Sequence, residues 1–84
     1  MVRNEALFGC AESMSPDVAA KLAQLADRFA ADLQLACGNK CVRLNSLIGI
    51  LSVPCRRGTP LTVIAEGEDE QAAARAIAAA LRGE

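Results

Sequence analysis

The stretch of sequence that decides the fold runs from residue 45 to residue 81 and reads NSLIGILSVPCRRGTPLTVIAEGEDEQAAARAIAAAL. Its first part is Ser46 followed by an apolar run, and serine is a favoured residue at the N-cap of a helix. Proline cannot continue a helix, because it lacks the N–H group and its ring clashes with the preceding turn. We therefore predict a short helix from Leu47 to about Val53 that Pro54 stops.

A strand and a longer helix follow within the same stretch. Residues 59–66 alternate between two faces, which is typical of a half-buried strand. The acidic run from Glu66 to Glu70 is interpreted as a helix start, because carboxylates are stabilised at the positive end of the helix dipole. One strand face is expected to hold Leu61, Val63 and Ala65, the other Thr62 and Ile64, and the inward stripe of the helix Ala73, Ile77 and Leu81 with Ala76 and Ala80 beside them.

The first residues of the chain predict a strand, a loop and a helix. Residues 2–8 alternate weakly and indicate an opening strand, and residues 9–14 indicate a loop. A helix start follows at Ser15-Pro16-Asp17, since serine suits the N-cap, proline the first helical position and aspartate the positive dipole end. Apolar residues then recur at steps of three and four, and the helix is expected to end within residues 28–30.

A hairpin is predicted between the two halves of the chain. Residues 32–37 and 42–44 alternate in polarity, and Gly38-Asn39-Lys40 between them has the chemistry of a turn. The element order is therefore β-α-β-β-α-β-α. Three amphipathic helices need one common apolar surface, so we predict an α+β fold in which a four-stranded antiparallel sheet carries three helices on one face. Residues 1–84 are expected to form a single domain.

The same stretch resembles HPr, the small phosphocarrier of the bacterial sugar phosphotransferase system. The resemblance lies in three motifs: a serine with its apolar helix, SLIGILSV at residues 46–53; a strand motif, GTPLTV at residues 58–63; and an acidic turn, AEGEDE at residues 65–70. It implies an HPr-like open-faced β-sandwich, which agrees with the element order derived above. It also implies a protein that is not an enzyme, acts through protein partners and uses no cofactor.

The phosphate-carrying position of the family is altered in this chain. Extended backward without gaps, the resemblance places the family's phosphorylatable histidine at Ser15 and its arginine at Asp17. The chain contains no histidine at all, so it cannot carry phosphohistidine. A carboxylate at residue 17 would repel a bound phosphate. We therefore interpret Ser15 as a structural N-cap and predict no catalytic residue.

The second functional position implied by the resemblance is Ser46, which many HPr proteins present to an ATP-dependent kinase. Leu47, Ile48 and Leu51 are then the expected partner-binding residues. The alternative for the serine is a simple helix cap, and some of the apolar residues could face inward instead. The implied partners are an HPr kinase-like enzyme, a transcription regulator of carbon catabolite control or a component of the phosphotransferase system.

Composition limits the remaining functions. The formal net charge is -1, which provides no basic surface for nucleic acid or an anionic membrane. No apolar run approaches the roughly 20 residues of a membrane span, and no signal peptide is recognisable, so we expect a cytoplasmic protein. The turn with Arg56 and Arg57 is interpreted as solvated rather than as an anion site.

The four cysteines leave a further alternative open. They are Cys10, Cys37, Cys41 and Cys55, and free thiols are favoured because no export signal is present. The alternatives are a disulfide within the hairpin and a metal held by the closely spaced Cys37 and Cys41, although the chain has no histidine to complete a metal site. We predict no metal. A constitutive HPr-fold adaptor and, less favoured, a cysteine-based redox or metal-binding protein are the alternatives to a regulatory role.

Overall fold

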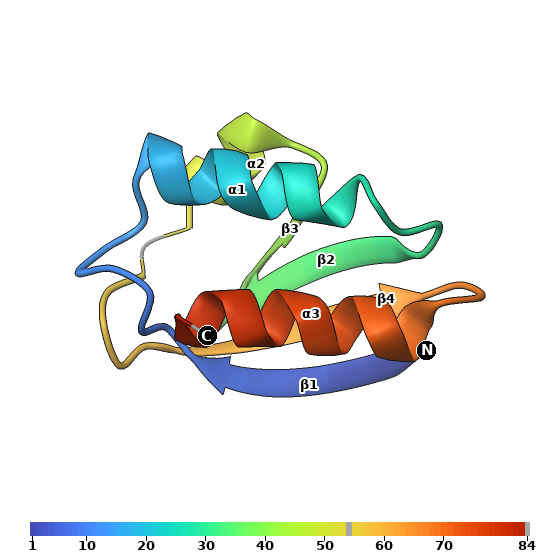
Figure 1. Cartoon of the computed structure of the whole chain (residues 1–84). Helices are drawn as coiled ribbons and strands as arrows, with labels where there is room; N and C mark the ends of the chain where they lie inside the picture. The colour runs from blue at the N-terminus through green and yellow to red at the C-terminus, as the bar shows by residue number, and fades with distance from the viewer. Residues whose placement is uncertain (54, 84) are drawn as a thin grey trace.

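A four-stranded antiparallel sheet forms one layer of the protein (Figure 1). The structure is a computed structural model that describes residues 1–53 and 55–83. Neighbouring strands in the sheet follow the order β1-β4-β2-β3, and every pair is antiparallel. The strands are β1 (Val2–Leu7), β2 (Asp32–Cys37), β3 (Lys40–Arg43) and β4 (Pro60–Glu66).

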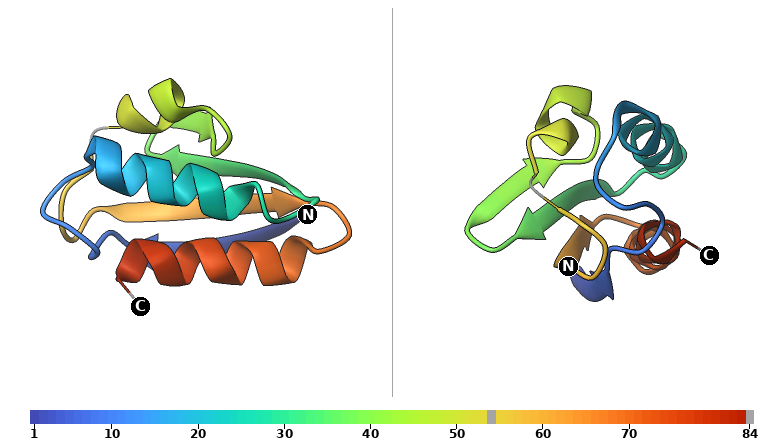
Figure 2. Two further views of the ribbon diagram at one scale, coloured as in Figure 1. Left: turned by 45° about the horizontal axis from the view of Figure 1, so that its top comes forward. Right: turned by 90° about the vertical axis from the view of Figure 1, so that its left-hand side faces the viewer.

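Three helices cover one face of this sheet, as the end-on view of Figure 2 shows. They are α1 (Pro16–Ala26), α2 (Leu47–Leu51) and α3 (Glu70–Arg82). The predicted element order and the open-faced arrangement are therefore confirmed. Among the described residues, no helix is long and apolar enough to cross a membrane.

The core lies between the sheet and the helices and is mostly aliphatic. In the central strand β4, Leu61, Val63 and Ala65 are buried, while Thr62 and Ile64 lie half-buried on the open face. This alternation matches the prediction, because successive side chains of a strand point to opposite faces. Phe8 is the one aromatic side chain in the buried set.

The inward stripe of α3 differs from the prediction on one side. Ala73, Ile77 and Leu81 are fully buried as expected, but their buried neighbours are Ala74 and Ala78, and the predicted Ala76 and Ala80 are only half-buried. Alanines flank the stripe on both sides, so the sequence could not show which flank the sheet would cover.

Two helices end earlier than predicted. Helix α1 ends at Ala26 rather than at residues 28–30, because the amides of Arg28 and Phe29 bond to carbonyls three residues back and so form a tighter turn. Helix α2 ends at Leu51 for the same reason, since the Val53 amide bonds to the carbonyl of residue 50. The predicted stop at Pro54 lies outside the described residues.

The acidic turn before α3 has a role that the sequence interpretation missed. The Asp69 carboxylate makes no cap bond to its own helix. Instead, its two oxygens accept hydrogen bonds from the amides of Ala30 (2.9 Å) and Ala31 (2.8 Å). Glu70 pairs with the Met1 amino group at 2.7 Å. Asp69 and Glu70 thus stand at the start of α3 as predicted, and Asp69 in addition ties the loop between α1 and β2 to this helix start.

Candidate functional site

Ser15 is the N-cap of α1, as predicted. Its Oγ accepts a hydrogen bond from the Val18 amide at 3.3 Å, and Pro16 fills the first turn without an N–H group. Asp17 is exposed in the same turn. An anion at this helix start would thus meet an amide that already has a partner and a carboxylate of like charge.

The loop that leads into α1 is anchored to the turn before β4. The Arg57 side chain donates to a Glu12 carboxylate oxygen (3.3 Å) and to the Gly9 carbonyl (3.1 Å). The Arg57 amide bonds to the Glu12 carbonyl, and the Met14 amide bonds to the Cys55 carbonyl. The arginine turn is exposed to solvent, as the sequence indicates, and Arg57 in addition holds this loop in place.

Ser46 caps α2 in the way the sequence indicates. Its Oγ accepts a hydrogen bond from the Gly49 amide at 3.2 Å, and its carbonyl accepts one from the Ile50 amide at 2.9 Å. The side chain is exposed to solvent. A Cβ at residue 49 would lie 3.2 Å from the Ser46 Oγ, so glycine leaves this side of the hydroxyl uncovered.

Beside Ser46, α2 displays three apolar side chains, which we call the docking patch. Exposed fractions are 44% for Leu47, 83% for Ile48 and 39% for Leu51. Ile50 points the other way and is fully buried. The structure therefore places all three predicted partner-binding residues at the surface, next to the serine, and uses a fourth residue to anchor the helix.

One residue of this region was missed by sequence reasoning. The Lys40 Nζ, from the hairpin, donates to the Ser52 carbonyl at the C-terminal end of α2, at 3.0 Å. In the sequence analysis Lys40 is a residue of the predicted turn and has no contact with the helix. Its pairing with Cys37 could have indicated the contact, because this register puts Lys40 on the face of the sheet that the helices cover.

The cysteines form no disulfide, and all four thiols are free. Cys37 lies on the same face as the buried Leu35, whereas Cys41 pairs with Ala36 and points to the opposite face. A bridge or a shared metal between Cys37 and Cys41 is therefore geometrically unfavourable. Within residues 1–53 and 55–83, no three cysteines or carboxylates lie close enough together to hold a metal ion.

Alkylation of the thiols should follow their burial. Without reductant, all four cysteines should react after mild unfolding, and in the native protein the exposed Cys41 should react first and the buried Cys55 last. Burial also raises the pKa of the Cys55 thiol, so less of the reactive thiolate is present at a given pH. Mass spectrometry after timed alkylation measures this order. Two cysteines that stay unreactive after unfolding would indicate a disulfide, and stoichiometric zinc a metal site.

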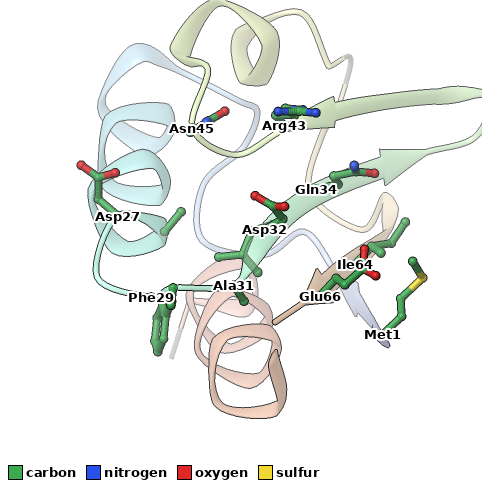
Figure 3. Close-up of a pocket in the computed structure, with 13 residues that line it drawn as sticks. Met1, Asp27, Phe29, Ala31, Asp32, Gln34, Arg43, Asn45, Ile64 and Glu66 are labelled. Atoms are coloured by element: carbon green, nitrogen blue, oxygen red, sulfur yellow. The ribbon is translucent and has the colours of Figure 1, made fainter. Parts of the chain in front are cut away.

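A cavity lies where the end of α1 leads into strand β2 (Figure 3). It measures about 380 Å³ and opens between the end of α1 and strands β2, β3 and β4. Its walls carry carboxylates from Asp27, Asp32 and Glu66 and the guanidinium of Arg43. None of the site residues predicted from the sequence is among those that line it.

Comparison with known proteins gives consistent results. A family model described as the PTS HPr component phosphorylation site matches residues 10–82. The HPr-like protein Crh of Bacillus subtilis is 41% identical over 66 residues, which cover 79% of this chain and 78% of that protein.

Solved structures agree with this match. The phosphocarrier protein HPr of Bacillus anthracis superposes with a TM-score of 0.89 at 30% identity, covering 95% of both chains. Crh of Bacillus subtilis, solved as an intertwined dimer, superposes with a TM-score of 0.79 at 34% identity, covering 98% of this chain and 94% of that one.

Proposed function

The chain belongs to the HPr family, and we propose that residues 1–84 form one HPr-like domain that regulates protein partners without carrying phosphohistidine. Proteins of this family are phosphocarriers and regulators rather than enzymes. The proposal places the protein in the cytoplasm and makes Ser46 its control point. The observation that carries it is an exposed, helix-capping Ser46 directly beside the exposed docking patch.

Loss of the carrier role follows from the chemistry of the phosphate bond. An imidazole phosphoramidate is labile and passes its phosphate onward, whereas a serine phosphoester is stable and a poor donor. This chain contains no histidine. Ser15 stands at the proposed carrier position with its Oγ bound to the Val18 amide, and Asp17 adds a negative charge. We therefore assign Ser15 a structural role.

Phosphorylation of Ser46 is compatible with the local geometry. The hydroxyl is exposed, and it is already oriented by the Gly49 amide, which can bond to a phosphate oxygen instead. Negative charge is favourable at the start of a helix. A phosphate here would leave the fold intact and place about two negative charges beside Leu47 and Ile48.

The docking patch suits a partner with an apolar surface of its own. Ile48 exposes most of its side chain, and burying it against a partner removes apolar area from water. We expect that partner to be an HPr kinase-like enzyme, a transcription regulator or a component of the phosphotransferase system. Adding phosphate next to the patch then strengthens or weakens binding according to the charge of the partner.

Two weaker candidates remain. A constitutive adaptor would use the same patch without modification of Ser46. A cysteine-based function is less favoured, because Cys37 and Cys41 point to opposite faces of the hairpin.

The kinase assay tests Ser46 directly. With ATP and an HPr kinase from the same source, the wild-type protein should acquire one phosphate, and Ser46→Ala should acquire none while losing only about 1 kcal/mol of stability with the cap. Ser13→Ala, at another exposed serine, is the matched control and should be labelled normally. Labelling that persists in Ser46→Ala, or wild-type protein that is never labelled, would favour the constitutive adaptor.

The same assay tests the docking patch. Ile48→Ser should slow labelling, because the kinase loses an apolar contact. Leu7→Ser removes a side chain that is 59% exposed on β1, away from α2, and should leave the rate unchanged. Equal rates for the two variants would remove the patch from the proposal.

A further inference from the structure

Helix α2 is too short to be stable without contacts to the rest of the protein. It has five residues, and isolated helices shorter than about 12 residues are marginal in water because nucleation is costly. Yet all three residues of the docking patch lie on it. The direction in which the patch faces must therefore be set by contacts from outside the helix.

Three residues hold the inner side and the start of α2. Ile50 is fully buried and Val53 is 2% exposed, so both fix the helix against the core. Ser46 caps the first turn through the Gly49 amide. The carbonyls of residues 48–50 are satisfied within the last turn, by the amide and Oγ of Ser52 and the amide of Val53. The Ser52 carbonyl, in contrast, accepts its hydrogen bond from another element.

Lys40 supplies the missing contact from a different element. The pairing of Cys37 with Lys40 closes the hairpin between β2 and β3 and puts the lysine side chain on the helix-covered face. From there its Nζ reaches the Ser52 carbonyl at 3.0 Å. Ser52 is the C-cap residue of α2, and a cation is favourable at this negative end of a helix.

We propose that Lys40 is a positioning residue for the docking patch. By holding the Ser52 carbonyl it fixes the C-terminal end of α2 and thereby the orientation in which Ile48 and Leu51 meet a partner. This inference deepens the proposed function and rests on it for the identity of the patch. It also gives the edge strand β3 a role in recognition without contact between β3 and the partner.

Amide hydrogen exchange tests the positioning without any partner. In Lys40→Met, the amides of Ser52 and Val53, which are bonded in the last turn of α2, should exchange about fivefold faster, because this turn opens more often. Lys40→Arg, which keeps the charge and the donors, should restore slow exchange. The matched control is Lys21→Met, since Lys21 is exposed and forms no hydrogen bond or ion pair within the described part of the chain.

Amides of β4 serve as the reference for global stability. Faster exchange in α2 with unchanged exchange in β4 supports local positioning. Unchanged exchange in α2, or an equal increase in α2 and β4, would overturn it.

The kinase assay provides the functional readout. With Lys40→Met, kcat/KM for Ser46 labelling should fall severalfold, whereas Lys40→Arg and Lys21→Met should match the wild type. A wild-type rate in Lys40→Met would overturn the role in docking. If the wild-type protein is never labelled, the proposed function fails, and the hydrogen exchange of α2 still decides whether Lys40 positions this helix.

Discussion

Phosphoenolpyruvate and the first enzyme of the phosphotransferase system should leave the wild-type protein unphosphorylated, and Ser15→His together with Asp17→Arg should make it accept phosphate. The substitution at residue 15 supplies the imidazole and removes the Oγ that now occupies the Val18 amide. The substitution at residue 17 replaces a repelling carboxylate with a guanidinium that can pair with phosphate. Acid-labile phosphate, measured with radiolabelled phosphoenolpyruvate, reports the transfer.

The single variants separate the two contributions. Ser15→His alone should accept little phosphate, because Asp17 still opposes the charge in the first turn of α1. Asp17→Arg alone should accept none, because no imidazole is present. Acid-labile phosphate on the wild-type protein would contradict the assignment of Ser15 as a structural residue.

Gly67→Ala should destabilise the protein by about 3 kcal/mol or more. Gly67 has φ +152°, and a Cβ there would lie 2.7 Å from the Cα of Ala31. Ala31 cannot easily move away, because it is 8% exposed and its amide is bound to the Asp69 carboxylate at 2.8 Å. The free energy of unfolding in urea measures the loss.

Gly38→Ala is the control for backbone strain alone. Gly38 also has a positive φ, +60°, but no atom lies within 4 Å of the Cβ position. Its substitution should cost about 1–2 kcal/mol. If Gly67→Ala lowers the free energy of unfolding no more than Gly38→Ala does, the close approach between the turn at Gly67 and the loop at Ala31 does not contribute to stability.

Local signals in the sequence were enough to predict the elements and both helix caps. Ser15 and Ser46 cap their helices through amides three residues later, a contact that depends only on the neighbouring chain. Strand β4 could be predicted for the same reason, because the alternation between its two faces is contained in a single segment of the sequence.

Contacts between distant segments were not predictable in this way. Asp69 binds amides 39 and 38 positions away, and nothing near the acidic run indicates these partners. Lys40 reaches the Ser52 carbonyl only because α2 packs over the hairpin, which the sequence pattern leaves undetermined. The residues of the docking patch were predicted through the family resemblance, but their exposure, and the burial of Ile50 instead, required the packed structure.

Mapping the phosphorylated residue tests the central claim most directly. The wild-type protein is incubated in parallel with ATP and an HPr kinase from the same source, and with phosphoenolpyruvate and the first enzyme, and the intact protein and its fragments are then analysed by mass spectrometry. We predict one phosphate on Ser46 from ATP and none from phosphoenolpyruvate. Phosphate accepted from phosphoenolpyruvate, or an ATP-derived phosphate on a residue other than Ser46, would contradict the account.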